Sequence, residues 1–200
     1  MQAATDLVLL QFRMADPHAA ARLGAPWRAF CAAAEPSLHA RRAAWSAATA
    51  TAYIYLEPAQ AMGGMDLALL AQDFARRFAG ASEVRASRLE QVFDAVGASA
   101  GERAVFHYAV ETDPEEGWMA EIARWYDTEH MPGLAAVPGC IRATRFINHG
   151  HGPLSLACYD LVREETLGSP PWLAVRATAW SDIARPHFTN TRRTMFSVLP

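Results

Sequence analysis

The strongest constraint on the fold is an order of elements that occurs twice along the chain. Alternating apolar residues predict strands in the first half at 6–14, 38–46, 50–57 and 87–97. The strands expected in the second half are 103–112, 140–149, 153–161 and 191–200. Helical patterns predict helices at 18–34, 65–79, 115–130 and 169–184, with Pro26 as a break in the first. Each half therefore has the order strand, helix, strand, strand, helix, strand.

This order is that of the ferredoxin-like unit, four antiparallel strands with two helices on one face. The other face of such a sheet is apolar and must be buried against something. We therefore expect an α+β fold in which tandem ferredoxin-like βαββαβ repeats pack sheet to sheet as an intramolecular dimeric α/β barrel. The predicted domains are residues 1–98, a degenerate repeat, and residues 99–200, which carry a Glu-His motif.

The alternation of side chains along the strands predicts which residues face a cavity between the sheets. Phe106 and Tyr108 share one face of the strand expected at 103–112, and His107 lies on the other. The more apolar face is expected to pack on helices. His107 and its counterpart in the first strand, Gln11, are then expected to face the interior between the two sheets.

Composition is that of a globular protein without a nucleic-acid partner. The 200 residues are 52% hydrophobic and 20% charged, with a net charge of -3. No basic block appears, which argues against nucleic acid. The chain has three cysteines, Cys31, Cys140 and Cys158, and no CxxC motif. They are expected to be reduced. The apolar run near the N-terminus is too short for a signal peptide or membrane span, so a cytoplasmic location without membrane contact is expected.

The stretch WYDTEHMPG (125–133) combines aromatic rings, carboxylates and a histidine with a Pro-Gly pair. Pro132 and Gly133 predict that the helix ends or bends soon after His130. The dipole at a helix C-terminus favours cations, so the imidazole is expected to gain a proton easily there. A histidine of this kind serves as a general acid or base. Tyr126, one turn earlier, is expected to donate a hydrogen bond to a substrate oxygen.

Other polar residues have simpler explanations than catalysis. Asp127 and Glu129 are expected to be solvated or to pair with N–H groups, with Asp127 exposed. The segment NHGHGP (148–153) has two histidines, His149 and His151, whose spacing would allow both to ligate one metal ion. Its Gly, Asn and Pro residues favour the turn of a β-hairpin, and no third ligand is evident, so no metal is expected.

Two arginines lie on one expected strand of the second half, Arg142 and Arg145. An arginine facing the cavity would hold a carboxylate or enolate. The alternation does not decide which of the two points inward, and ion pairing on an exposed edge is the alternative. The remaining expected substrate-binding residues are Trp125, Gln11 and Tyr159.

The second half resembles a known type of protein. The phrase WYDTEHMPGLAAVPGCIRATRF, followed by LACYDL, GSPPWLAV and ARPHF, resembles the dimeric α/β-barrel superfamily and is similar to EthD-like proteins. The resemblance covers about residues 103–200, whereas the first half shares only the order of elements. It implies that His130 looks into the cavity, beside Trp125, Tyr126 and Glu129. The superfamily holds cofactor-free monooxygenases, muconolactone-type isomerases, polyketide cyclases and dehydratases, and haem-binding chlorite dismutases.

Three functional hypotheses follow. The first is cofactor-independent proton transfer (a lyase or isomerase) on a hydrophobic aromatic or carbonyl-bearing substrate, with His130, Tyr126 and His107 as the catalytic residues. The second is haem- or dioxygen-dependent oxidation, with His130 or His187 at the iron. The third is a non-catalytic protein that sequesters a hydrophobic ligand, so whether the chain is an enzyme stays open. The outer edge strands also permit a homodimer.

Overall fold

The computed structural model describes the 200-residue chain except residues 1–5, 22, 34–37 and 60–64. The strands of the first half are β1 (Asp6–Arg13), β2 (Leu38–Ser46), β3 (Thr51–Pro58) and β4 (Ser82–Val96). Those of the second half are β5 (Phe106–Pro114), β6 (Cys140–Asn148), β7 (Ser155–Leu161) and β8 (Phe188–Val198).

The helices follow the first and third strands of each half. They are α1 (Pro17–Ala21), α2 (Gly24–Ala33), α3 (Leu67–Arg77), α4 (Met119–Trp125), α5 (Met131–Ala135), α6 (Pro170–Arg176) and α7 (Ala179–Ala184). None of the helices in the described part of the chain is long and apolar enough to cross a membrane.

The chain divides into two compact units. The first contains the chain up to Gln91 together with Asn148–His151 and Phe196–Pro200. The second contains Val92–Ile147 and Gly152–Met195. Strands β4 and β8 therefore contribute residues to both units. The predicted domain boundary between residues 98 and 99 stays a prediction.

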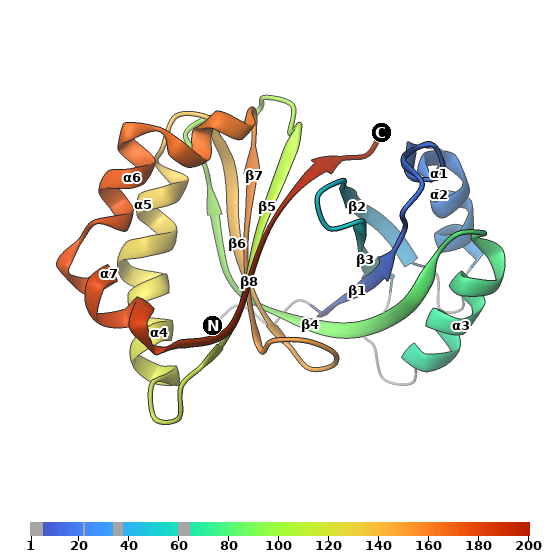
Figure 1. The fold of residues 1–200 in the computed structure, drawn as a ribbon, viewed down its shortest axis with the longest axis horizontal. Helices are drawn as coiled ribbons and strands as arrows, with labels where there is room; N and C mark the ends of the chain where they lie inside the picture. The colour runs from blue at the N-terminus through green and yellow to red at the C-terminus, as the bar shows by residue number, and fades with distance from the viewer. Residues whose placement is uncertain (1–5, 22, 34–37, 60–64) are drawn as a thin grey trace. The chain divides into compact units, whose positions relative to one another are not determined.

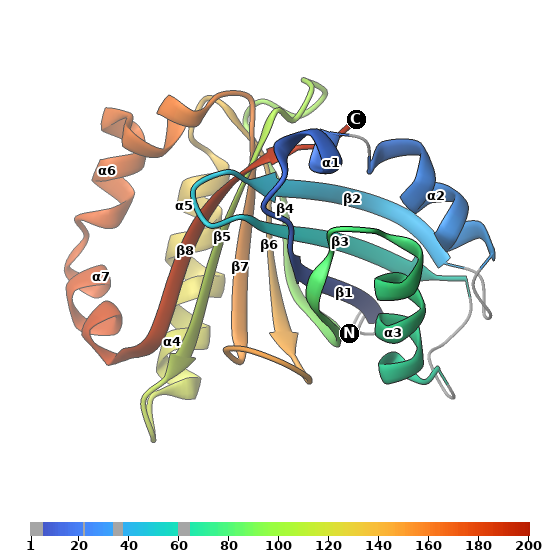
Figure 2. The same ribbon diagram turned by 45° about the vertical axis from the view of Figure 1, so that its right-hand side comes forward.

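In the first unit the antiparallel strand order is β4-β1-β3-β2, and the end of β8 pairs with β2. Helices α1, α2 and α3 cover one face of this sheet (Figure 2). Val8, Leu10 and Phe12 of β1 pack with residues of these helices in one buried cluster. The more apolar face of the first strand thus packs on helices, as its alternation predicts.

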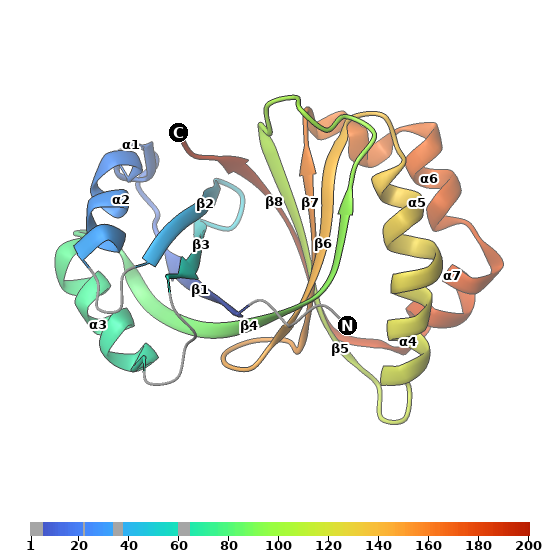
Figure 3. The same cartoon turned by 180° about the vertical axis from the view of Figure 1, so that it is seen from behind.

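In the second unit the strand order is β8-β5-β7-β6-β4. Helices α4 to α7 lie together on one face of the sheet formed by β5, β7 and β6, as Figure 1 and the view from behind in Figure 3 both show. The side chains on this face include Tyr108 of β5 and Tyr159 of β7, which pack with Trp125 of α4 and Trp172 of α6. This layer between helices and sheet contains the candidate site.

The expected α+β class is confirmed, and both halves show the predicted order of elements. Several boundaries differ from the predicted ones. The expected helix 18–34 is divided into α1 and α2, and Pro26 lies in the first turn of α2, where a proline is tolerated. Residues 22 and 34 of that helix lie outside the described residues. The expected helix 169–184 is divided into α6 and α7, and β4 begins five residues before the expected strand 87–97. The packing of two repeats sheet to sheet stays a prediction.

Candidate functional site

The helix that carries WYDTEHMPG does not end at Pro132, contrary to expectation. Helix α4 continues as a π turn over Tyr126–His130 and then as α5 to Ala135. In the π turn the N–H of Met131 donates to the carbonyl of Tyr126, five residues earlier. A proline inside an α-helix lacks one N–H donor and clashes with the carbonyl four residues before it. The wider turn immediately before Pro132 relieves this conflict, so the chain continues as a helix.

The π turn directs two side chains inward and uses two outward carboxylates as anchors. Tyr126 and His130 are buried. The Asp127 carboxylate is exposed, as expected, and accepts a hydrogen bond from Nη2 of the buried Arg145 at 2.9 Å. The Glu129 carboxylate accepts one from Oγ1 of Thr178, the N-cap residue of α7, at 2.6 Å. Turns of this type are frequent at functional sites.

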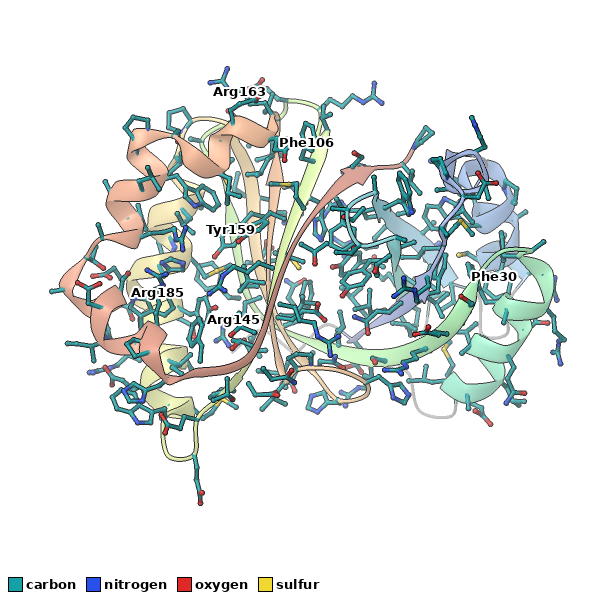
Figure 4. All side chains as sticks on the ribbon, viewed as in Figure 1. Phe30, Phe106, Arg145, Tyr159, Arg163 and Arg185 are labelled. Atoms are coloured by element: carbon teal, nitrogen blue, oxygen red, sulfur yellow. The ribbon has the colours of Figure 1, made fainter. Side chains whose placement is uncertain are left out.

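A pocket lies within the second unit, between the helices and the sheet. The space open to water-sized molecules is about 30 Å³, within a depression of about 380 Å³ that includes open solvent. The lining residues are Tyr108, Val110, Trp125, Tyr126, His130, Leu134, Tyr159, Trp172, Arg176, Arg185, Phe188 and Arg193. Figure 4 shows Tyr159 extending from the sheet and Arg185 from the helical side toward this layer. The pocket therefore combines aromatic walls with cationic groups.

His130 is a neutral imidazole in this pocket. Its side chain is 8% exposed, and its ring stacks on Trp125 with centroids 4.1 Å apart. Burial, with smaller contributions from the nearby guanidinium groups of Arg176 and Arg185, lowers the pKa of His130 to about 3. The expected gain of a proton from a helix C-terminus is wrong, because the helix continues to Ala135. A neutral imidazole presents one donor and one acceptor nitrogen.

Three buried polar atoms of lining residues have no hydrogen-bond partner. They are Nδ1 of His130 and Nε1 of Trp125 and Trp172. Buried polar groups in folded proteins are normally paired, and an unpaired one is destabilising unless water or a ligand satisfies it. The residues around the pocket therefore contain two indole N–H groups and one imidazole nitrogen that the rest of the protein leaves unsatisfied.

The tyrosines of the pocket remain protonated. Burial raises the pKa of Tyr108, Tyr126 and Tyr159. The hydroxyl of Tyr159 donates to Sδ of Met131 at 3.0 Å, so this phenol is already engaged. Tyr126, the predicted catalytic tyrosine, lines the pocket with its ring 5.7 Å from that of His130. These phenols can donate hydrogen bonds but do not act as bases near neutral pH.

Sequence reasoning missed the three arginines of the pocket. Arg176 ends α6, Arg185 begins the 3₁₀ turn after α7, and Arg193 lies on β8. Burial lowers the pKa of Arg185, and the charges of Arg176 and Arg193 lower it further. Their positive charges therefore act on one another. The only sequence signal was the motif ARPHF, which contains Arg185 but shows no periodicity that assigns it to a site.

His107 lies on the face of the sheet opposite to the pocket. Its neighbour Tyr108 lines the pocket, and successive side chains of a strand point to opposite faces. Nδ1 of His107 is 2.9 Å from Oδ1 of Asp160, its partner on β7, and both residues are buried. The expectation that His107 and His130 approach one space is therefore wrong. Gln11 lies on β1 in the first unit, and its place at a cavity stays a prediction.

The two strand arginines have different surroundings. Arg142 is partly exposed and pairs with Asp94, with Nε 2.6 Å from Oδ1. Arg145 is buried, and its guanidinium carbon lies 5.4 Å from the centroid of the Tyr126 ring. Arg145 is thus the one that points to the helices. It lies beside the pocket tyrosine and is not among the lining residues.

Comparisons with known proteins identify the fold. No family model and no curated protein matches the chain. An anthrone oxidase-like protein has a similar structure, with a TM-score of 0.69 and 12% identity over 100% of this chain and 93% of that one. A chlorite dismutase of Candidatus Nitrospira defluvii has a TM-score of 0.67 and 8% identity over 100% and 92% of the two chains. A ferredoxin-fold protein of Listeria monocytogenes related to antibiotic biosynthesis monooxygenases has a TM-score of 0.51 and 8% identity over 98% and 95%.

These likenesses establish a fold shared with ferredoxin-like proteins. At such low identities they establish nothing about activity. The closer resemblance to EthD-like proteins stays a prediction.

Proposed function

We propose that the protein is a small-molecule enzyme that transfers a proton on an aromatic, carbonyl-bearing substrate, with His130 as the base. The observation that carries the proposal is the buried imidazole, whose Nδ1 has no partner, in a pocket lined by arginines. A concave pocket with apolar walls and a few polar groups is the usual form of a small-molecule site. Tyr126 and Trp125 belong to its walls.

The proposed step balances without a cofactor. His130 accepts a proton from the carbon next to the carbonyl. The electron pair of that C–H bond forms the C=C bond of the enolate, and the π pair of the carbonyl moves onto its oxygen. Cationic donors fixed in place before the reaction stabilise such a charge. Arg176 and Arg185 supply positive charge in the pocket. Return of the proton at a second position completes an isomerisation.

The low pKa of His130 belongs to the pocket without a ligand. Burial is the main cause of the low pKa, and Arg176 and Arg185 lower it further by repelling an additional positive charge. A negative group bound near them offsets that repulsion, so substrate binding raises the basicity of His130. His130 is therefore a stronger base in the complex with substrate than in the free protein.

The pocket does not fit a haem, the cofactor of the alternative hypothesis. The whole depression, open solvent included, is about 380 Å³, near the lower end of the roughly 300–1,000 Å³ of pockets for drug-sized ligands, which is too small for a haem. His187, the second imidazole considered for iron, stacks on Trp118 and contacts Glu115 instead. No step is derived through haem.

The test uses phenylpyruvate, whose enol and keto forms interconvert by proton transfer and absorb differently in the ultraviolet. We expect the protein to accelerate this interconversion. His130→Gln is expected to lose about 100-fold in kcat/KM, the usual contribution of a general base. Arg163→Gln, an exposed arginine on the loop before α6, is the matched control and is expected to match the native protein.

An unchanged rate in His130→Gln would contradict the assignment of the base. Consumption of dioxygen during the same assay would show instead that the carbanion reacts with oxygen. That outcome would favour the cofactor-free oxidation hypothesis.

A further inference from the structure

The pocket has an excess of positive charge. Its lining contains Arg176, Arg185 and Arg193, and no aspartate or glutamate is among the described lining residues. Asp182 acts on Arg185 from nearby, but its effect on the Arg185 pKa is smaller than the opposing effects of Arg176 and Arg193. Clustered like charges repel one another, so a ligand that brings negative charge relieves this repulsion.

The same pocket holds unpaired buried donors. The indole nitrogens of Trp125 and Trp172 have no partner, and both side chains are 1% exposed. Trp27 of the first unit has an unpaired indole as well, so an unpaired indole alone does not identify a site. In the second unit two unpaired indoles occur together with an unpaired imidazole and three arginines around one cavity. This combination is matched by a ligand that is rich in oxygen acceptors.

The walls suit an aromatic ring. Tyr108, Tyr159 and Trp172 contact one another as a cluster, with the Tyr159 and Trp172 centroids 5.2 Å apart. Phe188 stacks on Tyr126 on another side of the pocket, with centroids 5.8 Å apart. Aromatic rings favour such offset and edge contacts with a bound ring. The depression of about 380 Å³ gives such a ring room.

We infer that the ligand of this pocket is an aromatic carboxylate, whose carboxylate is held by Arg176 and Arg185 and whose oxygens accept from the indoles of Trp125 and Trp172. The inference rests on the proposed function, because it names the substrate class of the same site. Arginine is suited to this task, because its planar group donates two parallel hydrogen bonds to a carboxylate.

The experiment is calorimetric titration of the full chain with three unreactive acids, benzoate, phenylacetate and 1-naphthoate, each beside its uncharged amide. We expect at least one acid to bind about tenfold or more tightly than its amide, since a hydrogen bond to a charged group contributes roughly 1.5–3 kcal/mol. Arg185→Gln is expected to remove this preference. Arg163→Gln, which keeps the same change of net charge away from the pocket, is expected to retain it.

Equal affinity for acids and amides, or no saturation by any acid at roughly 10 mM, would overturn the inference. Arg176→Gln is a second variant, because Arg176 is the other member of the proposed pair and its partly exposed side chain at the end of α6 makes misfolding a smaller concern. Its loss of acid preference would support the inference if Arg185→Gln fails to fold. Retention of the full preference in a folded Arg185→Gln protein would exclude the arginine pair as the carboxylate site.

The outcomes separate this inference from the proposed function. If the acids bind as expected but phenylpyruvate is not converted, the proton-transfer proposal fails and the ligand class stands. If phenylpyruvate is converted with the same KM by the native and Arg185→Gln proteins, the ligand class fails and proton transfer stands. His130→Gln is expected to lose conversion while it still binds the acids.

Discussion

The layer between helices and sheet is built mainly around phenylalanines in the first unit, together with Trp27 and its unpaired indole, and around tyrosines, tryptophans and His130 in the second. Phe74 stacks on Phe78 with centroids 4.2 Å apart, and Phe12 and Phe30 pack against Phe74 at 4.9 and 5.3 Å. In the second unit the corresponding layer contains tyrosines, tryptophans and His130. One order of elements therefore serves two purposes, an apolar core in one unit and a pocket with unpaired polar atoms in the other.

The comparison teaches that the polar residues of the second unit are not required by the fold. An apolar layer is sufficient to hold helices on a sheet of this kind, as the first unit shows. Buried polar atoms without partners destabilise a protein. Their concentration around one cavity of the second unit is therefore better explained by a ligand than by packing.

The largest expected effect is on the apolar core. Phe74→Ala should lower the free energy of unfolding by about 3–5 kcal/mol, because the side chain is fully buried among three other rings. Urea denaturation followed by circular dichroism measures the change. A loss below about 1 kcal/mol would show that the first unit is not the closely packed member of the pair.

The second prediction concerns His130→Phe, which makes part of the pocket resemble the phenylalanine layer of the first unit. In the native protein the pKa of His130 is about 3, below the unfolded value of about 6.5. Between about pH 3 and 6.5 the unfolded chain carries a proton on His130 that the folded protein does not. The contribution of His130 to stability is therefore complete above pH 6.5 and is lost as pH falls toward 3. From about pH 6.5 to 4.5 this contribution falls by about 2 kcal/mol.

His130→Phe lacks this group and is expected to lose less stability over the same pH range. The difference between the two proteins in urea midpoint at each pH isolates the histidine from other titrating groups. Parallel pH profiles of the two proteins would show that His130 is not held neutral by burial.

The third prediction concerns the anchor of the π turn. Asp127→Asn leaves the buried guanidinium of Arg145 without its carboxylate and is expected to cost about 1–2 kcal/mol, discounted because Asp127 itself is exposed. Asp73→Asn breaks exposed pairs with Arg76 and Arg77 on α3 and is expected to cost clearly less, because solvent screens exposed ion pairs. Thermal melts of both variants provide the test. Equal losses would mean that the burial of Arg145 has no energetic consequence.

The smallest effect is expected for Tyr159→Phe. This change removes a hydroxyl whose acceptor is the weak thioether of Met131, so the cost is expected to be about 1 kcal/mol or less. It also makes this position resemble the phenylalanine layer of the first unit. Chemical denaturation measures the loss, and a value above about 2 kcal/mol would show that the Tyr159 hydroxyl has a larger structural role.

The fold was accessible from the sequence because strands and helices leave periodic patterns. The alternation in β1 predicts correctly that Val8, Leu10 and Phe12 pack on helices. In the same way, the alternation in β5 predicts that Tyr108 packs there. The site was less accessible, because the pocket lies on the helix-facing side of the sheet and not on the face that carries His107. Arg176, Arg185 and Arg193 come from three elements and share no spacing, so only tertiary structure brings them together.

The π turn also misled the prediction of the helix end. Pro132 and Gly133 ordinarily mark the end of a helix. Whether a chain widens its helix before a proline or ends it depends on tertiary contacts, here the anchors of Asp127 and Glu129. Such contacts are not visible in a local pattern. The same contacts keep His130 buried, which reverses the expected direction of its pKa.

The π turn at Tyr126–His130 has a consequence for the evolution of this chain. A single π turn is equivalent to one residue inserted into an α-helix, and each residue of an α-helix advances the chain by about 100° around the axis. Deleting one residue here would restore regular winding and leave Met131 and Leu134 buried on the sheet as they are now, whereas regular winding without the deletion would rotate them by about 100°. Relatives that lack the pocket are therefore expected to align with a one-residue gap at this turn.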